Sequence, residues 1–190
     1  MWLICGLGNP GKKYQNTRHN IGFEIIESLI KKYNFKLYKK DKLKEIYKGK
    51  IDQEQCMICK SLVYMNQSGE AIGSVVKFYK IPNSKILIIH DDLDLAIGKV
   101  KIKTSGGNGG HNGLLSIDKA ISNNYKRLRI GIGHPGSKKL VSSYVLKKFP
   151  KDDKKIINII IDLIVNLFSL SFENESLLLT KVSLELKKVS

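Results

Sequence analysis

The chain has 190 residues, which is enough for one domain with a single hydrophobic core. Apolar residues make up 42% and charged residues 26% of it, a globular composition that excludes a fibrous or disordered chain. The net charge of +16 indicates a polyanionic partner, but only three of the 33 basic residues are arginines, and such lysine richness is also typical of a solvated surface.

The predicted elements alternate between strands and helices along the chain. In the first third we expect a strand at Met1–Gly6, a polar loop at Leu7–His19, a helix at Ile21–Lys32, and short strands on either side of Asp52 with Gln55–Leu62 continuing the sheet. A helix at Ser68–Tyr79 and strands at Ile86–His90 and Val100–Lys103 are expected next. The rest should form a helix after Gly106–Gly113, a strand at Arg127–Ile132 and mostly helix over Asp152–Lys188. The pattern predicts an α/β fold, with one domain over residues 1–190 and a mixed, twisted β-sheet flanked by helices. Sites in such sheets gather at loops beyond the strand ends.

The segment GLGNPG (Gly6–Gly11) follows the first strand and has the GxGxxG spacing of dinucleotide-binding folds. Such a site needs a helix that begins at the final glycines and places the pyrophosphate at its N-terminus. Lys12–His19 is polar instead, and no acidic residue ends a second strand at the expected distance. We therefore expect a tight turn that presents Asn9, with a nucleotide-dependent enzyme as the alternative.

Cys56 and Cys59 have CxxC spacing inside QCMICKSLVYM, which is expected to be a strand. An offset of three sends the two side chains to opposite faces of a strand. No second pair of cysteines completes a zinc site. We expect neither metal nor redox chemistry there.

The motif HDDLD (His90–Asp94) ends the apolar strand ILIIH and allows two interpretations. Carboxylates beside an imidazole bind divalent metals, but alternating side chains beyond a strand diverge and no second ligand motif is present. A carboxylate at a strand end can instead bond an imidazole, hold its tautomer and raise its basicity. The metal site stays open as the alternative.

The segment GGNGGHNG (Gly106–Gly113) carries so many glycines that a sharp turn or the close approach of a ligand is expected. Lys99, Lys101 and Lys103 precede it at a period of two and therefore share one face of a strand. Since these lysines lie beside a glycine loop that carries Asn108 and Asn112, they are expected to contact phosphate, although three lysines on an exposed strand face can also be merely solvated.

The four histidines lie in different predicted settings. His19 ends the polar loop, where a lone histidine is more often simply solvated. His90 ends a buried strand, and its ring is expected to be packed or bonded to backbone. His111 and His134 lie in glycine-containing loops, and no pattern assigns either of them a role.

The C-terminal apolar stretch Ile156–Phe168 is shorter than the ~20 residues that span a bilayer. Asn158, Asp162 and Asn166 interrupt it at helical spacing, which predicts one polar stripe on a core helix. The N-terminus has no signal-peptide pattern, and three cysteines do not make a disulfide framework, so a cytoplasmic location is expected.

The motifs taken together resemble those of bacterial-type peptidyl-tRNA hydrolases. They are GLGNPG (Gly6–Gly11), TRHN (Thr17–Asn20), MNQSG (Met65–Gly69), HDDLD (His90–Asp94), GGNGGHNG (Gly106–Gly113) and RLRIGIGHPG (Arg127–Gly136). The resemblance runs in register to about Pro150 and continues more loosely to the end. It implies one mixed-sheet α/β domain, usually monomeric, that needs no metal or cofactor. The implied reaction is hydrolysis of the ester joining a peptide to the 3′-terminal ribose of tRNA, which releases both during translation.

The resemblance also implies roles for single positions. His19 matches the catalytic base, Asp91 the carboxylate that supports it, and Asn9 the residue that distinguishes N-blocked substrates from free aminoacyl-tRNA. The implied substrate-binding residues are Tyr14, Tyr64, Met65, Asn66 and Asn112, and the implied tRNA contacts are Lys101, Lys103 and Arg129. Tyr64 stands where phenylalanine is common in the family, which keeps an aromatic face.

The residue types suit this chemistry. Hydrolysis of an ester needs water and a base of near-neutral pKa, which histidine supplies, and neutral amides can stabilise charge on the carbonyl oxygen. The GxSxG elbow of serine esterases is absent from the sequence, which disfavours an acyl-enzyme. The main rival class is a non-catalytic RNA-binding domain, which would need neither His19 nor Asp91 but would usually show an aromatic RNP motif.

Overall fold

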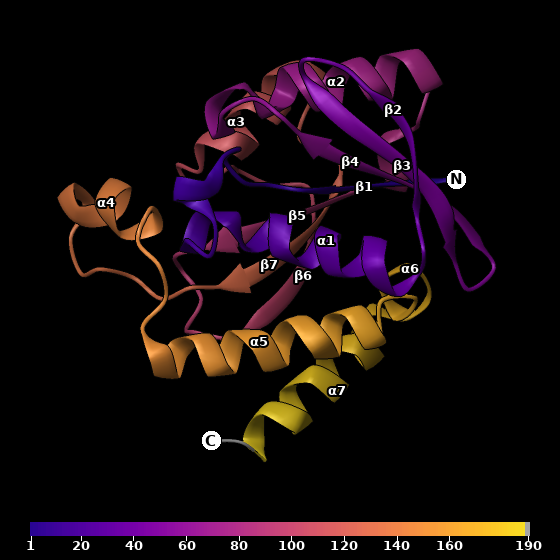
Figure 1. Cartoon of the computed structure of the whole chain (residues 1–190). Coiled ribbons are helices and arrows are strands. Elements are labelled where there is room, and N and C mark those ends of the chain that lie inside the picture. Colours follow the sequence, from indigo (N-terminus) through magenta and orange to yellow (C-terminus); the bar gives the residue numbers. More distant parts are fainter. Residues whose placement is uncertain (189–190) are drawn as a thin grey trace.

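A 7-stranded sheet forms the centre of the computed structural model, which describes residues 1–188 (Figure 1). The strands are β1 (Trp2–Gly6), β2 (Lys36–Lys40), β3 (Lys44–Ile51), β4 (Glu54–Ser61), β5 (Ile86–Asp92), β6 (Val100–Thr104) and β7 (Lys126–Gly131). Their order across the sheet is β2-β3-β4-β1-β5-β7-β6. β4, β1, β5 and β7 pair in parallel, whereas β2, β3 and β6 add antiparallel strands at the two edges. The mixed sheet expected from the sequence is confirmed.

Helices cover both faces of this sheet (Figure 1). They are α1 (Ile21–Lys32), α2 (Ser68–Tyr79), α3 (Asn112–Ile121), α4 (Val141–Val145), α5 (Lys151–Asn166), α6 (Leu170–Glu173) and α7 (Glu175–Lys187). One apolar core lies between the sheet and α1, α5 and α7, and a second lies between the sheet and α2 and α3. Both faces of the central strands are therefore buried, which explains why ILIIH is almost purely apolar.

Side-chain alternation along the strands distributes residues between the two cores. Ile4 of β1 lies in the first core and Leu3 in the second. Cys56 and Cys59 of β4 divide in the same way, so the expected opposite orientation of the CxxC pair is confirmed. Both are buried free cysteines.

The segment after β1 differs from the polar loop that the sequence predicted. It contains two 3₁₀ turns, Lys12–Tyr14 and Arg18–Asn20, and its last residues are buried. The first α-helix begins only at Ile21. The glycines of GLGNPG are therefore not followed at once by the helix that a dinucleotide site requires.

Two elements were not anticipated from the sequence. Every residue of β2 is exposed, so no apolar alternation marks it, and its pairing with β3 defines it as a strand. The short helix α4 has a single buried residue, Val145. The polar stripe predicted for α5 is confirmed, since Asn158, Asp162 and Asn166 are all exposed. Within the described chain, no helix combines the length and the apolar character needed to cross a membrane.

Candidate active site

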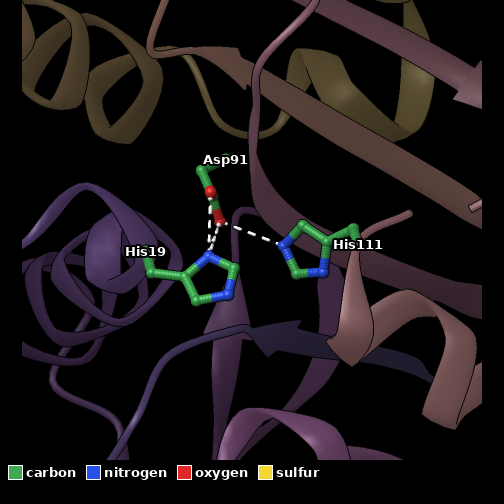
Figure 2. Close-up of side chains that lie close together, drawn as sticks. All are labelled: His19, Asp91 and His111. Atoms are coloured by element: carbon green, nitrogen blue, oxygen red, sulfur yellow. Dashed lines mark hydrogen bonds and ion pairs between the residues drawn. The ribbon is translucent and has the colours of Figure 1, made fainter. Parts of the chain in front are cut away.

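A cavity of about 970 Å³ opens where β1 and β5 end and α3 begins. Three residues far apart in the sequence meet at its wall (Figure 2). His19 comes from the 3₁₀ turn before α1, Asp91 from β5 and His111 from the residue that caps α3. His19 and Asp91 lie at the carboxyl ends of the parallel strands β1 and β5, whereas the glycine-rich loop after the antiparallel strand β6 brings His111 to them.

Asp91 holds His19 through one ring nitrogen. Nδ1 of His19 lies 2.9 Å from both carboxylate oxygens, and both side chains are buried. Nε2 of His19 has no hydrogen-bond partner within residues 1–188 and points away from Asp91 (Figure 2). The solvated setting expected for a lone loop histidine is therefore wrong, because the loop folds back against the sheet and leaves His19 only 8% exposed.

The pKa values of this pair shift in opposite directions. Burial alone would lower the pKa of His19, but the attraction and hydrogen bond of Asp91 outweigh it and raise that pKa above the usual histidine value. Burial alone would raise the pKa of Asp91, but the charges and N–H donors of His19 and His111 hold it well below the ordinary carboxylate value. Asp91 is therefore ionised throughout the physiological range, and its charge stabilises the imidazolium form of His19.

Sequence reasoning missed His111, which shares the carboxylate. Its Nε2 lies 3.0 Å from Oδ1 of Asp91, while its Nδ1 accepts hydrogen bonds from the backbone N–H groups of Gly113 and Leu114. Since Nδ1 accepts, the proton must be on Nε2, which donates to Asp91. A polar acceptor directly before a helix is a capping signal, and it was the one clue available in the sequence.

His90 packs behind this group. Its Nδ1–H donates to the backbone carbonyl of Asp91 at 2.7 Å, and its ring contacts that of His111 edge-to-face. Burial, reinforced by His111, lowers the pKa of His90 to about 3. The expected structural role, a ring packed and bonded to backbone, is confirmed.

Asn9 is fixed at the cavity by bonds on both sides. Its backbone N–H and carbonyl pair with the side-chain amide of Asn20, and its Oδ1 accepts from the backbone N–H of Met65 at 2.8 Å. These bonds orient the Asn9 amide so that Nδ2 remains as a donor, and Asn9 and Met65 both line the cavity. Asn9 is thus presented at the cavity by these bonds, and no hydrogen-bonded turn of the expected kind lies over residues 7–10.

The structure divides the remaining predicted site residues into two groups. Asn66, Asn112, Lys103 and Arg129 line the cavity. Three others lie outside it: Tyr14, Tyr64 and Lys101. The two tyrosine rings contact each other edge-to-face, with their centres 6.2 Å apart. The charge of Arg129 is partly used within the protein, because its Nε donates to Asp92 at 2.6 Å.

The metal alternative for HDDLD takes a different form in three dimensions. His19, Asp91 and His111 offer ligand atoms that all lie within 4.8 Å of one another, a spacing that could hold a cation. Hydrogen bonds already join these side chains through Nδ1 of His19 and Nε2 of His111, so a metal bound to either nitrogen would have to replace them. Asp92 bonds Arg129 instead of joining this group.

Known proteins share both the sequence and the fold of this chain. A sequence model of a family described as peptidyl-tRNA hydrolase matches residues 3–188. A peptidyl-tRNA hydrolase of Rickettsia canadensis is 48% identical, with 92% of this chain and 95% of that protein covered, and one of Bartonella quintana is 46% identical, with 92% and 91% covered. A crystal structure of peptidyl-tRNA hydrolase from Acinetobacter baumannii matches with a TM-score of 0.86 at 40% identity, covering 98% of this chain and 92% of that one.

Proposed function

The chain belongs to the peptidyl-tRNA hydrolase family and hydrolyses peptidyl-tRNA, and we propose that His19 is the general base of this reaction, supported by Asp91. The observation that carries the proposal is the asymmetric bonding of one imidazole. Nδ1 of His19 is bound to a buried carboxylate, whereas Nε2 is unpartnered among the described residues and His19 lines the cavity.

In the neutral imidazole, Nδ1–H donates to Asp91 and Nε2 carries the lone pair. Nε2 takes a proton from water as the water attacks the ester carbonyl of the substrate. Asp91 stabilises the imidazolium that forms, and Nε2 then returns the proton to the ribose oxygen that leaves. No covalent intermediate with the protein is needed.

Two amides supply donors for the charge that develops on the carbonyl oxygen. Asn66 and Asn112 line the cavity with exposed side chains, and neither side chain makes a hydrogen bond within residues 1–188. Neutral donors placed where negative charge develops lower the barrier without a change of protonation.

Asn9 selects substrates through the orientation of its amide. Because Oδ1 is occupied by the N–H of Met65, Nδ2 offers N–H donors to the substrate. A peptide or N-blocking carbonyl can accept such a bond. The free ammonium group of an aminoacyl-tRNA has only donors, so it finds no partner there.

RNA binding is assigned to the basic side of the cavity. Lys103 and Arg129 line it and can pair with backbone phosphates, while Lys101, Tyr14 and Tyr64 lie outside the cavity and would contact more distant parts of the substrate. We also propose that the protein acts as a monomer, since one chain supplies the residues that line the cavity, and that it works in the cytoplasm without metal or cofactor.

The test is release of free tRNA from purified peptidyl-tRNA in the presence of EDTA. Wild-type protein should turn over, and folded His19→Ala protein should not. Turnover by folded His19→Ala near the wild-type rate would refute the mechanism. Binding of tRNA without hydrolysis by the wild-type protein would instead favour a non-catalytic RNA-binding domain. The molar mass of the wild-type protein, measured by light scattering, tests whether it is a monomer.

A further inference from the structure

Arg127 of β7 lies beneath the first half of the glycine-rich loop. Only 3% of it is exposed, although a buried charge is stable only when it is paired and hydrogen-bonded. Its Nη1 donates to the carbonyl of Gly107 at 2.8 Å and its Nη2 to the carbonyl of Gly106 at 2.9 Å. The planar guanidinium thus bonds two consecutive peptide groups at once.

A half-buried carboxylate, Asp118, holds Arg127 in this position. Asp118 of α3 accepts from Nη2 of Arg127 at 3.3 Å and from the hydroxyl of Tyr125 at 2.7 Å. The guanidinium also lies over the Tyr125 ring, 4.8 Å from its centre. The position of Arg127 under the loop is therefore fixed from two sides.

The bonds to Arg127 decide which way the loop's peptide groups face. Residues 1–188 contain no cis peptide, and in a trans peptide the N–H points opposite to the carbonyl before it. The carbonyls of Gly106 and Gly107 point toward Arg127, so the N–H groups of Gly107 and Asn108 point away from Arg127. Neither N–H has an acceptor within the described part of the chain, and both residues line the cavity.

A cation lies on the same stretch of loop. Nζ of Lys103 is 2.8 Å from the place that a Cβ on Gly106 would take, and Gly106 has a φ of 108°, which favours glycine. The second half of the loop is held through His111, which bonds Asp91 through its ring and Asn108 through its backbone N–H. One half of the loop is thus tied to Arg127, and the other to the proposed catalytic carboxylate.

We propose that Arg127 is a positioning residue for RNA binding, which turns the N–H groups of Gly107 and Asn108 outward to bind a tRNA backbone phosphate together with Lys103. Arg127 borders the cavity but is only 3% exposed, and its Nη atoms are bonded to the loop, so it acts through the loop backbone and not as a substrate contact. The role extends the proposed function on which it rests, and it predicts an effect on binding rather than on the hydrolysis step.

The kinetic test is Arg127→Lys, which keeps the charge but loses the fork that bonds two carbonyls. KM for peptidyl-tRNA should rise about tenfold, the equivalent of one charge-assisted hydrogen bond. kcat, the pH profile and turnover of an N-blocked aminoacyl ester without the tRNA body should stay near wild type. Asp118→Asn should change KM in the same direction, which keeps the test decisive if Arg127→Lys does not fold.

Tyr125→Phe is the matched control. It removes only the hydroxyl that bonds Asp118 and keeps every direct contact of Arg127: its two bonds to the loop, its bond to the Asp118 carboxylate and its place over the ring. KM should therefore stay close to wild type. An equal rise of KM in Tyr125→Phe, or an equal loss of activity on the small ester in Arg127→Lys, would mean a general structural role and would overturn the proposal.

A direct readout uses ¹⁵N-labelled His19→Ala protein and an acceptor-stem RNA minihelix without a peptide. Addition of the minihelix should shift the amide resonances of Gly107 and Asn108, and Arg127→Lys should reduce these shifts. Unchanged Gly107 and Asn108 resonances at a saturating minihelix concentration would overturn the proposal. If His19→Ala is inactive and Arg127→Lys has an unchanged KM, the role of Arg127 is refuted and His19 remains the general base. If His19→Ala is active and Arg127→Lys has a raised KM, His19 is not the general base and the role of Arg127 stands.

Discussion

Replacement of Asp91 by asparagine tests how the carboxylate supports His19. Oδ1 of Asp91 lies within hydrogen-bond distance of both His19 and His111, whereas Oδ2 contacts His19 alone. The amide oxygen of Asp91→Asn should therefore take the Oδ1 position and the amide nitrogen the Oδ2 position. That nitrogen carries hydrogens and would face Nδ1–H of His19 at 2.9 Å.

The size of the effect follows from this mismatch. The amide nitrogen can donate to Nδ1 and so favours the His19 tautomer protonated on Nε2, which cannot accept a proton from water. In the productive tautomer, Nδ1–H is left with a neutral amide oxygen that it shares with His111. Keeping the productive tautomer forfeits a hydrogen bond to a charged group, worth about 1.5–3 kcal/mol. This corresponds to a fall of roughly 10- to 150-fold in kcat/KM, a smaller loss than the ~10²- to 10⁴-fold expected when a general base is removed.

The assay is kcat/KM for peptidyl-tRNA measured between about pH 5 and about pH 9, where a histidine base titrates. His19 works as a base when it is deprotonated, so wild-type activity falls as the pH drops through its raised pKa. Removing the negative charge of Asp91 makes the imidazolium less favourable and lowers that pKa. The acidic limb of the profile should therefore move to lower pH in Asp91→Asn.

Two results would refute this reasoning. An acidic limb that stays in place would show that Asp91 does not set the pKa of His19. Recovery of Asp91→Asn activity by added Zn²⁺ or Mg²⁺ would show that His19, Asp91 and His111 act as a metal site. Circular dichroism and thermal unfolding of the variant show whether it is folded.

Three further substitutions separate chemistry, RNA binding and substrate selection. His19→Ala should lower kcat at least ~10²-fold on both peptidyl-tRNA and a small N-blocked ester, and a loss confined to peptidyl-tRNA would contradict it. Lys103→Ala should raise KM with little change in kcat and make the slope of log(kcat/KM) against log[salt] shallower by about 1. Lys101 lies outside the cavity, so Lys101→Ala should change KM and this slope less. Equal effects of the two substitutions would show that phosphate binding is diffuse. Asn9→Ala should lower the free energy of unfolding by about 1–3 kcal/mol, because it leaves the N–H of Met65 without an acceptor. Asn9→Asp should keep that acceptor yet lose activity, and urea titrations alongside rate measurements distinguish the two.

The sequence was sufficient for the secondary structure wherever burial follows a regular period. α1 and α2 begin and end at the predicted residues because their apolar side chains recur at helical spacing. The ILIIH run marked β5 as a strand covered on both faces. The sequence did not predict β2, because this strand has no buried face and is defined by its hydrogen bonds to β3.

The sequence also carried the family, because six motifs in one order are far more specific than any of them alone. The resemblance named Asn9, His19 and Asp91, and the structure places all three at one cavity. The resemblance did not single out His111 or Arg127, because the hydrogen bonds that make them important join segments far apart in the chain.

Tertiary structure alone decided the environment of these groups. His19 and Asp91 are 72 residues apart, and Asp91 and His111 are 20 apart, so no local period encodes their hydrogen bonds. The loop that carries His19 is polar in sequence, yet its last four residues are buried, since Asn20 and Arg18 tie them to Asn9 and to the carbonyls around α4. A side chain's pKa and its free donors depend on what lies across from it in space, and the order of strands in the sheet determines that.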